Sequence, residues 1–428
     1  MTQKQKQILQ FLFHSDRGNI VLIVGVALMI CLLWSLTVDN FYIVELDVVT
    51  YFYAGEVFAN GDIDYLRTPI YPLICYAFHH IFGDKVFESL ASLNIAVFLI
   101  SIVYFYRTIA LFTQRRATKF ITTALYAWNI LIAEMCLIIL AESITMSGII
   151  YLLYLLSLIY VGKASKSTLW KASATLLFLI LLRPFNICFI PLVGLVIVFA
   201  RLKGHIKQIR PAIAAFSPTA IILFSYCLWF KSVYGFFGFS YVSTINSFIA
   251  AGGAQIGDIH TTRYVSSEEI AGRKCYLWVW LDRDNCKTQI EQILKENYKE
   301  FIKDKIVFTG KSCFYYFPFA ITPTAHFYAA QIQSLYMGTI YIAILLLSIF
   351  EISLWVKKRR YRIDIIAFHL LLCITCIFTA IVGSADYGAN RLAMPMFPSL
   401  CLLVGLFIEQ TNLRFTNSVK PQYNFNKS

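Results

Sequence analysis

Four charged residues stand where apolar segments of the sequence begin or end. Asp47 precedes a short helical segment, Glu142 begins an apolar run, Arg183 separates two such runs and Arg391 precedes the last one. A carboxylate can accept a proton, and the planar guanidinium group suits phosphate. Charge beside a membrane is costly unless it is paired or used. We therefore expect the four side chains to gather around one cavity at the bilayer surface.

Each residue also has a purely structural interpretation. In this interpretation Asp47 caps the helix that follows it and has no other role. Glu142 interacts favourably with the dipole of its own helix and likewise has no other role. Arg183 and Arg391 could reach toward phospholipid headgroups without binding a substrate. The neighbouring acids Glu45, Glu56, Asp62 and Asp64 are typical of a solvated face.

The composition indicates a membrane protein. Hydrophobic residues make up 58% of the 428 residues and charged residues 14%, against about 45–50% and 25% in ordinary soluble domains. The net charge of +13 follows a topological pattern, since six short segments hold 21 of the 37 Lys and Arg residues with Asp16 as their only acid. Basic loops face the cytoplasm, so both termini are predicted to be cytoplasmic.

The fold class expected is an all-α polytopic membrane protein, one integral-membrane domain over residues 1–428, with about ten transmembrane helices. Two of the apolar runs, Ala172–Leu182 and Phe185–Ala200, are too short to cross alone at ~1.5 Å per residue. We expect each either to extend through its flanks or to cross in a thinned, tilted arrangement. The predicted spans are Asn19–Val38, Ser89–Tyr106, Phe120–Ala133, Ser143–Val161, Ala172–Leu182, Phe185–Ala200, Pro211–Phe230, Ile332–Phe350, Ile365–Gly383 and Leu392–Ile408.

Two large extracytoplasmic loops are predicted, at residues 39–88 and 233–331. In the first, a helix starts after Asp47 and stops at Asn60-Gly61, and a second runs from the prolines after Arg67 to Phe82-Gly83. Both helices are amphipathic and are expected to lie flat on the membrane. In the second loop, residues 284–305 predict a solvated amphipathic helix.

Several classes of site are missing from the sequence. No metal-ligand spacing, glycine-rich phosphate loop or nucleophile elbow occurs, which argues against common ATPases, metalloproteases and serine hydrolases. The basic segments alternate with the spans, so they do not indicate nucleic-acid binding. Cys275 and Cys286 could form a disulfide in the second loop, or remain free thiols.

A set of motifs, in order from residue 39 to 398, resembles the GT-C membrane glycosyltransferases. The nearest branches are the protein O-mannosyltransferase-like and aminoarabinose-transferase-like enzymes. The motifs are the helix after Asp47 with its Asn60-Gly61 stop, Arg67-Thr68-Pro69-Ile70-Tyr71-Pro72, Ala141-Glu142-Ser143, Leu182-Arg183-Pro184 and Asn390-Arg391-Leu392-Ala393-Met394-Pro395.

The resemblance implies a glycosyltransferase that takes a hexosyl or pentosyl group from a polyprenyl-phosphate donor, and transfers it to a lipid, glycan or protein acceptor at the outer face. Asp47 would be the general base, with Glu142 as a second catalytic residue. The donor and acceptor would be bound by Arg67, Tyr71, Arg183 and Arg391. The family often has an acidic pair where this chain has Asp47-Val48, so the sequence leaves open whether a divalent metal takes part, and it indicates no other cofactor.

Two other functions remain open at this point. An O-antigen polymerase or ligase also has many spans and a large late outer loop, but would rely on basic residues in that loop, such as Arg263 and Arg273. A flippase or transporter of lipid-linked sugars would place ionisable groups in the middle of its spans, whereas the predicted spans are nearly free of charge.

Overall fold

The protein is described here by a computed structural model. It covers residues 12, 15–36, 42–43, 48–206, 208–242, 363–383 and 394–415, with isolated positions between 299 and 353. The α-helices are α2 (Asp16–Ser35), α3 (Val48–Ala59), α4 (Ile70–Phe82), α5 (Val86–Phe112), α6 (Arg116–Ala127), α7 (Ile130–Leu137), α8 (Glu142–Tyr160), α9 (Lys166–Leu182), α10 (Phe189–Leu202), α11 (Arg210–Tyr234), α18 (Ile363–Gly383) and α20 (Phe397–Phe415). Three short 3₁₀ segments join them: η1 (Gly83–Lys85), η2 (Pro184–Cys188) and η3 (Met394–Met396).

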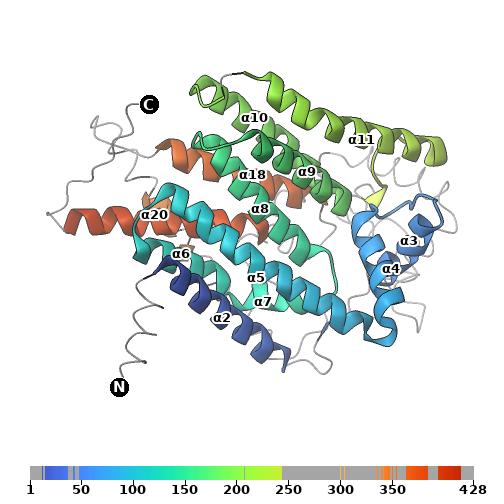
Figure 1. The fold of residues 1–428 in the computed structure, drawn as a ribbon, viewed down its shortest axis with the longest axis horizontal. Coiled ribbons are helices and arrows are strands. Elements are labelled where there is room, and N and C mark those ends of the chain that lie inside the picture. The colour runs from blue at the N-terminus through green and yellow to red at the C-terminus, as the bar shows by residue number, and fades with distance from the viewer. Residues whose placement is uncertain are drawn as a thin grey trace.

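Helix α8 is central in this arrangement (Figure 1). In its most apolar stretch 78% of the residues are buried, against 33% for α2 and for α11. Helices α5 and α9 pack directly on α8, while α2 and α11 lie farther out and expose many large apolar side chains. Such an apolar outer surface is suited to lipid. Helices α3 and α4 pack together at one end of the bundle.

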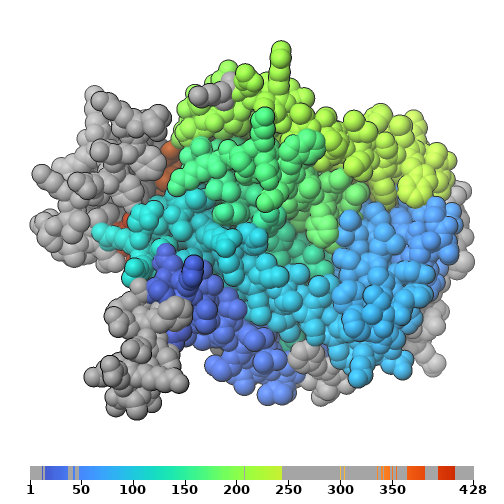
Figure 2. Space-filling view, viewed as in Figure 1, coloured from blue at the N-terminus to red at the C-terminus, as the bar shows by residue number. Residues whose placement is uncertain are grey.

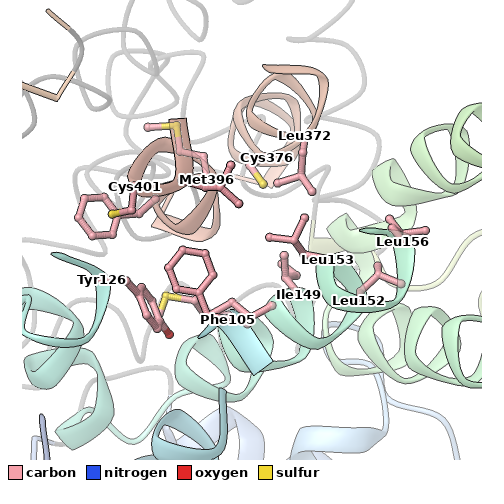
Figure 3. Packing of buried hydrophobic residues seen from close by; sticks show 14 of the residues in the cluster. Phe105, Tyr126, Ile149, Leu152, Leu153, Leu156, Leu372, Cys376, Met396 and Cys401 are labelled. Carbon is pink, nitrogen blue, oxygen red and sulfur yellow. The ribbon is translucent and has the colours of Figure 1, made fainter. Parts of the chain in front are cut away.

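The main hydrophobic core lies between α8 and the helices around it. Figure 3 shows Phe105 of α5, Tyr126 of α6, Leu153 of α8 and Met396 of η3 converging in this core. Cys376 and Cys401 pack there as buried free thiols, as expected for cysteines in apolar segments. The late segment of the chain is therefore joined to the early helices by side-chain packing.

Five of the described helical segments are long and apolar enough to cross a membrane, and a bent pair would make a sixth. The chain is thus an all-helical polytopic membrane protein. The predicted helix after Asp47 begins at Val48 and stops before Gly61, which has φ of +83°, and the second loop helix ends at Phe82 as predicted. Whether α3 and α4 lie flat on a membrane stays a prediction.

The predicted span Phe120–Ala133 is not one helix. It is divided into α6 and α7, whose axes differ by 46°. The side chain of Asn129 accepts hydrogen bonds from the N–H groups of Leu131 (2.9 Å) and Ile132 (3.3 Å), so it starts α7 anew and replaces the helical hydrogen bonds lost at the break. Glu134, inside α7, is 2% exposed.

The short spans do extend through their flanks. Helix α9 starts at Lys166, well before the predicted Ala172, and η2 with α10 forms one apolar segment over Pro184–Leu202. The predicted span Ile332–Phe350 is described only in part, and most of the second outer loop, with Cys275 and Cys286, lies outside the described residues. The count of ten therefore stays a prediction.

Two ion pairs join helix ends that the charge pattern assigns to the cytoplasmic side. Lys119 Nζ lies 2.7 Å from an Asp16 carboxylate oxygen, which joins α6 to α2. Lys203 Nζ, just after α10, lies 2.8 Å from Asp364 Oδ2 in the first turn of α18. These pairs tie neighbouring helices together at the ends away from α3 and α4.

The charge pattern leads to a first prediction, on topology. Cysteines introduced at Asp62 and Glu268 should react with a membrane-impermeant thiol reagent in intact cells, whereas cysteines at Lys166 and Arg359 should react only after permeabilisation. Asp62 and Lys166 are exposed in the structure, while Glu268 and Arg359 lie outside the described residues. Labelling of the Lys166 or Arg359 variant in intact cells would overturn the assigned orientation.

Candidate functional site

The structure brings Glu142 and Arg183 together. Arg183 Nη2 lies 3.1 Å from Glu142 Oε1, and the two side chains are only 13% and 5% exposed. Glu142 is the first residue of α8, where a carboxylate is favoured by the helix dipole, and Arg183 directly follows the last residue of α9. Because α8 and α9 pack side by side, the start of one meets the end of the other. The predicted proximity of these two residues is confirmed.

The segment after Arg183 is held in place by hydrogen bonds. Asn186 Nδ2 donates to the carbonyl oxygen of Leu179 at 2.8 Å, which satisfies one of the last carbonyls of α9. Pro184 prevents α9 from continuing, and Arg183 has an extended backbone with φ of −147°. The local sequence therefore ends the helix at the point where the guanidinium must turn toward Glu142.

A small cavity opens beside this ion pair. Its walls come from α8, from the segment after Arg183, from α18 and from η3. The lining residues are Glu142, Thr145, Ile149, Arg183, Phe185, Asn186, Phe189, Cys376, Thr379 and Pro395. Pro395 belongs to the late motif that begins at Asn390, so this motif reaches the cavity, although Arg391 itself lies outside the described residues. The cavity combines one ion pair with a mainly apolar wall.

Arg67 forms a second cluster with residues of α3. Its Nε donates to Thr50 Oγ1 at 2.9 Å and its Nη1 to Tyr51 Oη at 3.3 Å. The guanidinium carbon also lies 4.2 Å from the centre of the Tyr51 ring, an arrangement that favours a cation. Tyr51 in turn meets the edge of Tyr71 with ring centres 4.7 Å apart. The predicted residues Arg67 and Tyr71 thus belong to one cluster, linked through Tyr51.

The two clusters share one hydrophobic core. Tyr51 and Tyr71 pack in the same buried group as Ala141, Ile144 and Leu182, which are sequence neighbours of the Glu142 and Arg183 pair. Tyr71 is fully buried at the start of α4. Four of the six residues predicted for the site therefore occupy one region, where α3 and α4 meet the ends of α8 and α9.

Asp47 lies outside the described residues, but the residues on either side of its segment are described. Ile43 pairs with the chain after α7: its N–H donates to the Leu137 carbonyl (2.9 Å) and its carbonyl accepts from the N–H of Ile139 (3.0 Å). Val48 is 2% exposed, in the core that also holds Ala141. Residues 44–47 thus connect two points that both pack against the segment leading to Glu142.

Asp64 was missed by the sequence analysis, which interpreted it as part of a solvated face. The side chain is 1% exposed and lies three residues before Arg67. Its Oδ1 accepts hydrogen bonds from the N–H groups of Leu66 (2.8 Å) and Arg67 (2.6 Å). An Asp two or three residues before a turn and a proline is a recognised local pattern, so this contact had a sequence signal, whereas the burial had none.

No group of three His, Cys, Asp or Glu residues within the described part of the chain is arranged to hold a metal ion. Glu45 and Asp47, the first-loop acids nearest the predicted base, lie outside that part.

Comparisons with known proteins give two distant likenesses. No protein-family model and no curated protein sequence matches the chain. The archaeal oligosaccharyltransferase AglB from Archaeoglobus fulgidus, solved with an inhibitory peptide and a dolichol-phosphate, aligns with 96% of this chain at 9% identity and a TM-score of 0.46. The chain spans about half the length of that protein, 52%.

ArnT from Cupriavidus metallidurans, solved with undecaprenyl phosphate, aligns over 95% of this chain and 82% of its own length at 12% identity, with a TM-score of 0.38. Both solved structures are GT-C fold membrane glycosyltransferases, the group that the sequence motifs resemble. At these scores neither likeness carries an inference about the site, so its function is argued from the residues of this chain.

Close packing of α3 on α4 leads to a second prediction. A Cβ added at Gly55 would lie 2.6 Å from the carbonyl oxygen of Pro72 and 2.9 Å from Tyr76 Cβ. Gly55→Ala should therefore push α3 away from α4 and lower the free energy of unfolding by about 1–3 kcal/mol, as overpacking does. Gly25→Ala in α2 is the control, since nothing lies within 4 Å of its added Cβ. Equal melting temperatures for the two variants would contradict the close approach.

Proposed function

We propose that the protein is a glycosyltransferase that moves a sugar from a polyprenyl-phosphate donor to an acceptor at the extracytoplasmic face of the membrane. The observation that carries this proposal is the buried ion pair of Glu142 and Arg183, which lines a mainly apolar cavity. A polyprenyl phosphate has the matching chemistry, since its tail stays in the bilayer at ~0.8 kcal/mol per buried CH₂ and its head is an anion.

Arg183 is suited to hold the phosphate of the donor. A guanidinium has five N–H donors, and the contact with Glu142 occupies one of its two terminal nitrogens. The remaining donors can bind phosphate oxygens, and Arg391 is proposed to supply a second cation. The carboxylate of Glu142 fixes the direction of the Arg183 guanidinium and limits its freedom before the donor binds.

Asp47 is proposed to accept the proton of the acceptor hydroxyl. The acceptor oxygen forms a new bond to the anomeric carbon, and the bond from that carbon to the phosphate oxygen breaks with its electron pair. The phosphate leaves as an anion and needs no proton, so one general base is sufficient. Packing of Ile43 and Val48 against the chain before Glu142 supports the placement of Asp47 at this site.

Arg67 and Tyr71 are proposed to complete the substrate-binding surface. The Arg67 guanidinium is held by Thr50 and Tyr51, and the fully buried Tyr71 supports the Tyr51 ring at its edge.

The direct test is recognition of the lipid phosphate. Undecaprenyl phosphate should raise the melting temperature of the purified protein, because a ligand that binds the folded state stabilises it, while undecaprenol, which lacks the phosphate, should not. Arg183→Gln should weaken binding about tenfold or more, since a hydrogen bond to a charged group contributes about 1.5–3 kcal/mol. Lys166→Gln removes a charge from the opposite end of α9 and serves as the control.

The same protein should then transfer radiolabelled sugar from a lipid extract that contains polyprenyl-phosphate sugars, with release of polyprenyl phosphate. Equal stabilisation by undecaprenol and undecaprenyl phosphate, with no transfer from any lipid-phosphate sugar, would reject the proposed function.

A further inference from the structure

The loop between α3 and α4 is built around the buried carboxylate of Asp64. This side chain is 1% exposed, although its sequence neighbour Asp62 is exposed to solvent. The two N–H groups that Asp64 Oδ1 accepts belong to Leu66 and Arg67, at 2.8 and 2.6 Å. These contacts fix the backbone immediately before the Arg67 side chain. The direction in which Arg67 leaves the loop therefore depends on Asp64.

The end of α11 holds the same loop from the other side. The Tyr241 N–H donates to the carbonyl oxygen of Tyr65 at 2.9 Å, and the Tyr234 hydroxyl donates to the carbonyl oxygen of Ile63. The rings of Tyr65 and Tyr241 are stacked, with centres 4.9 Å apart. Figure 2 shows this end of α11 against the surface formed by α3 and α4. Ile63 is thus anchored to the last residue of α11, and Tyr65 to Tyr241 in the segment that follows this helix.

The second oxygen of Asp64 has a different environment. Within the described part of the chain, Oδ2 is buried without a hydrogen-bond partner, and so is the hydroxyl of Tyr226 on α11. Arg67 is the ionisable group whose charge acts on Asp64, and the charge of Asp64 in turn acts on Tyr226. Burial raises the pKa of Asp64 from 3.8 to about 6, although the N–H groups of Arg67 and Leu66 and the charge of Arg67 favour the carboxylate.

We propose that Asp64 is a positioning residue that presents the Arg67 guanidinium to the substrate, acting through the backbone of residues 65–67. This inference rests on the proposed function, in which Arg67 binds substrate. The ionised carboxylate accepts the two N–H groups and attracts the Arg67 side chain, which then contacts Thr50 and Tyr51. Loss of this acceptor frees the loop backbone and releases the guanidinium from its fixed direction.

The kinetic test separates positioning from a merely structural role. Asp64→Ala should raise the KM for the lipid donor about tenfold or more at pH 7.5, because Arg67 is no longer held. Asp64→Asn retains the acceptor oxygen in the same place and should stay within about threefold of the wild-type KM. Asp62→Asn, in the same loop but exposed, should behave as wild type.

A double-mutant cycle shows whether Asp64 acts through Arg67. The variant Asp64→Ala/Arg67→Ala should have a KM no higher than Arg67→Ala alone, since the group that Asp64 positions is already absent. If the increases in KM of the two single variants multiply in the double variant, the proposal is overturned. If the protein transfers no sugar, the melting temperatures of the same four proteins measure the coupling between Asp64 and Arg67. Failure of the proposed function can therefore be distinguished from failure of this inference.

The pH dependence of the melting temperature can be measured without substrate, on variants that keep the fold. An acid whose folded pKa is raised contributes most to stability below its unfolded pKa, and this contribution is lost as pH rises through the folded pKa. The melting temperature of wild type and of Asp62→Asn should therefore contain a decline between about pH 4 and 6 that Asp64→Asn lacks. An identical profile for Asp64→Asn and wild type would show that Asp64 is not the buried carboxylate described here.

Discussion

Purified Asp47→Asn protein is expected to fold as wild type does, yet to transfer sugar roughly 10²–10⁴-fold more slowly, the range that general-base catalysis contributes. Asparagine cannot accept the proton of the acceptor hydroxyl. It caps a helix about as well as aspartate, so α3 should still begin at Val48. The measurement is sugar transfer from the lipid donor, together with a thermal unfolding curve of the same preparation.

The structural interpretation of Asp47 gives the opposite result. If the residue only caps α3, Asp47→Asn should be almost silent and Asp47→Ala should cost about 1 kcal/mol of local stability. Glu56→Gln is a suitable control, because Glu56 is an exposed acid of α3. Transfer by Asp47→Asn within about threefold of wild type, well below the general-base range, would remove Asp47 as the base and direct attention to Glu45 and Glu142.

Arg183→Ala should have two separable effects. It leaves the 5% exposed Glu142 side chain without its cation, and removal of one partner of a buried ion pair costs about 3–5 kcal/mol. It should also abolish transfer, or raise the KM for the donor strongly, because the phosphate loses its guanidinium. Arg183→Lys should retain only part of the activity, since an ammonium group cannot make the two-pronged contact.

The double variant Glu142→Gln/Arg183→Gln distinguishes stability from function. The double variant leaves no unpaired charge in the buried site, so the melting temperature should recover toward wild type. Transfer should remain lost, because neither amide binds phosphate as a cation does. Recovery of both properties would mean that the pair is structural and that donor recognition lies elsewhere.

Local sequence patterns predicted the parts of the structure that depend on local forces. Apolar length located α2, α5 and α8, and Asn60-Gly61 marked the end of α3. The proximity of Glu142 and Arg183 was predicted from their positions at span ends, whereas their ion pair was not.

The features that local sequence patterns did not predict depend on tertiary contacts. The break between α6 and α7 depends on the Asn129 side chain folding back on its own helix, and on the Trp128 indole donating to the carbonyl oxygen of Ile23 in α2. The loop around Asp64 is held by Tyr234 at the end of α11 and by Tyr241 after it, both far away in the sequence. Asp47 and Arg391 lie outside the described residues, so their placement stays a prediction.

The polar face of α6 has a consequence for biogenesis. Lys119, Thr122 and Thr123 on this helix are each at most 4% exposed. A Cβ at Gly405 of α20 would lie only 1.9 Å from Thr122 Oγ1, so α20 covers part of this face in direct contact. Lipid offers no hydrogen bonds to an ammonium or hydroxyl group, so α6 needs protein around it.

Helix α20 follows every other described helix in the chain. Most of the chain is therefore translated before α20 can pack on α6. During that time its polar face must be shielded by the insertion machinery or by the early helices. Chains that terminate before Phe397 would lack α20 and would present an incompletely covered α6 to the bilayer.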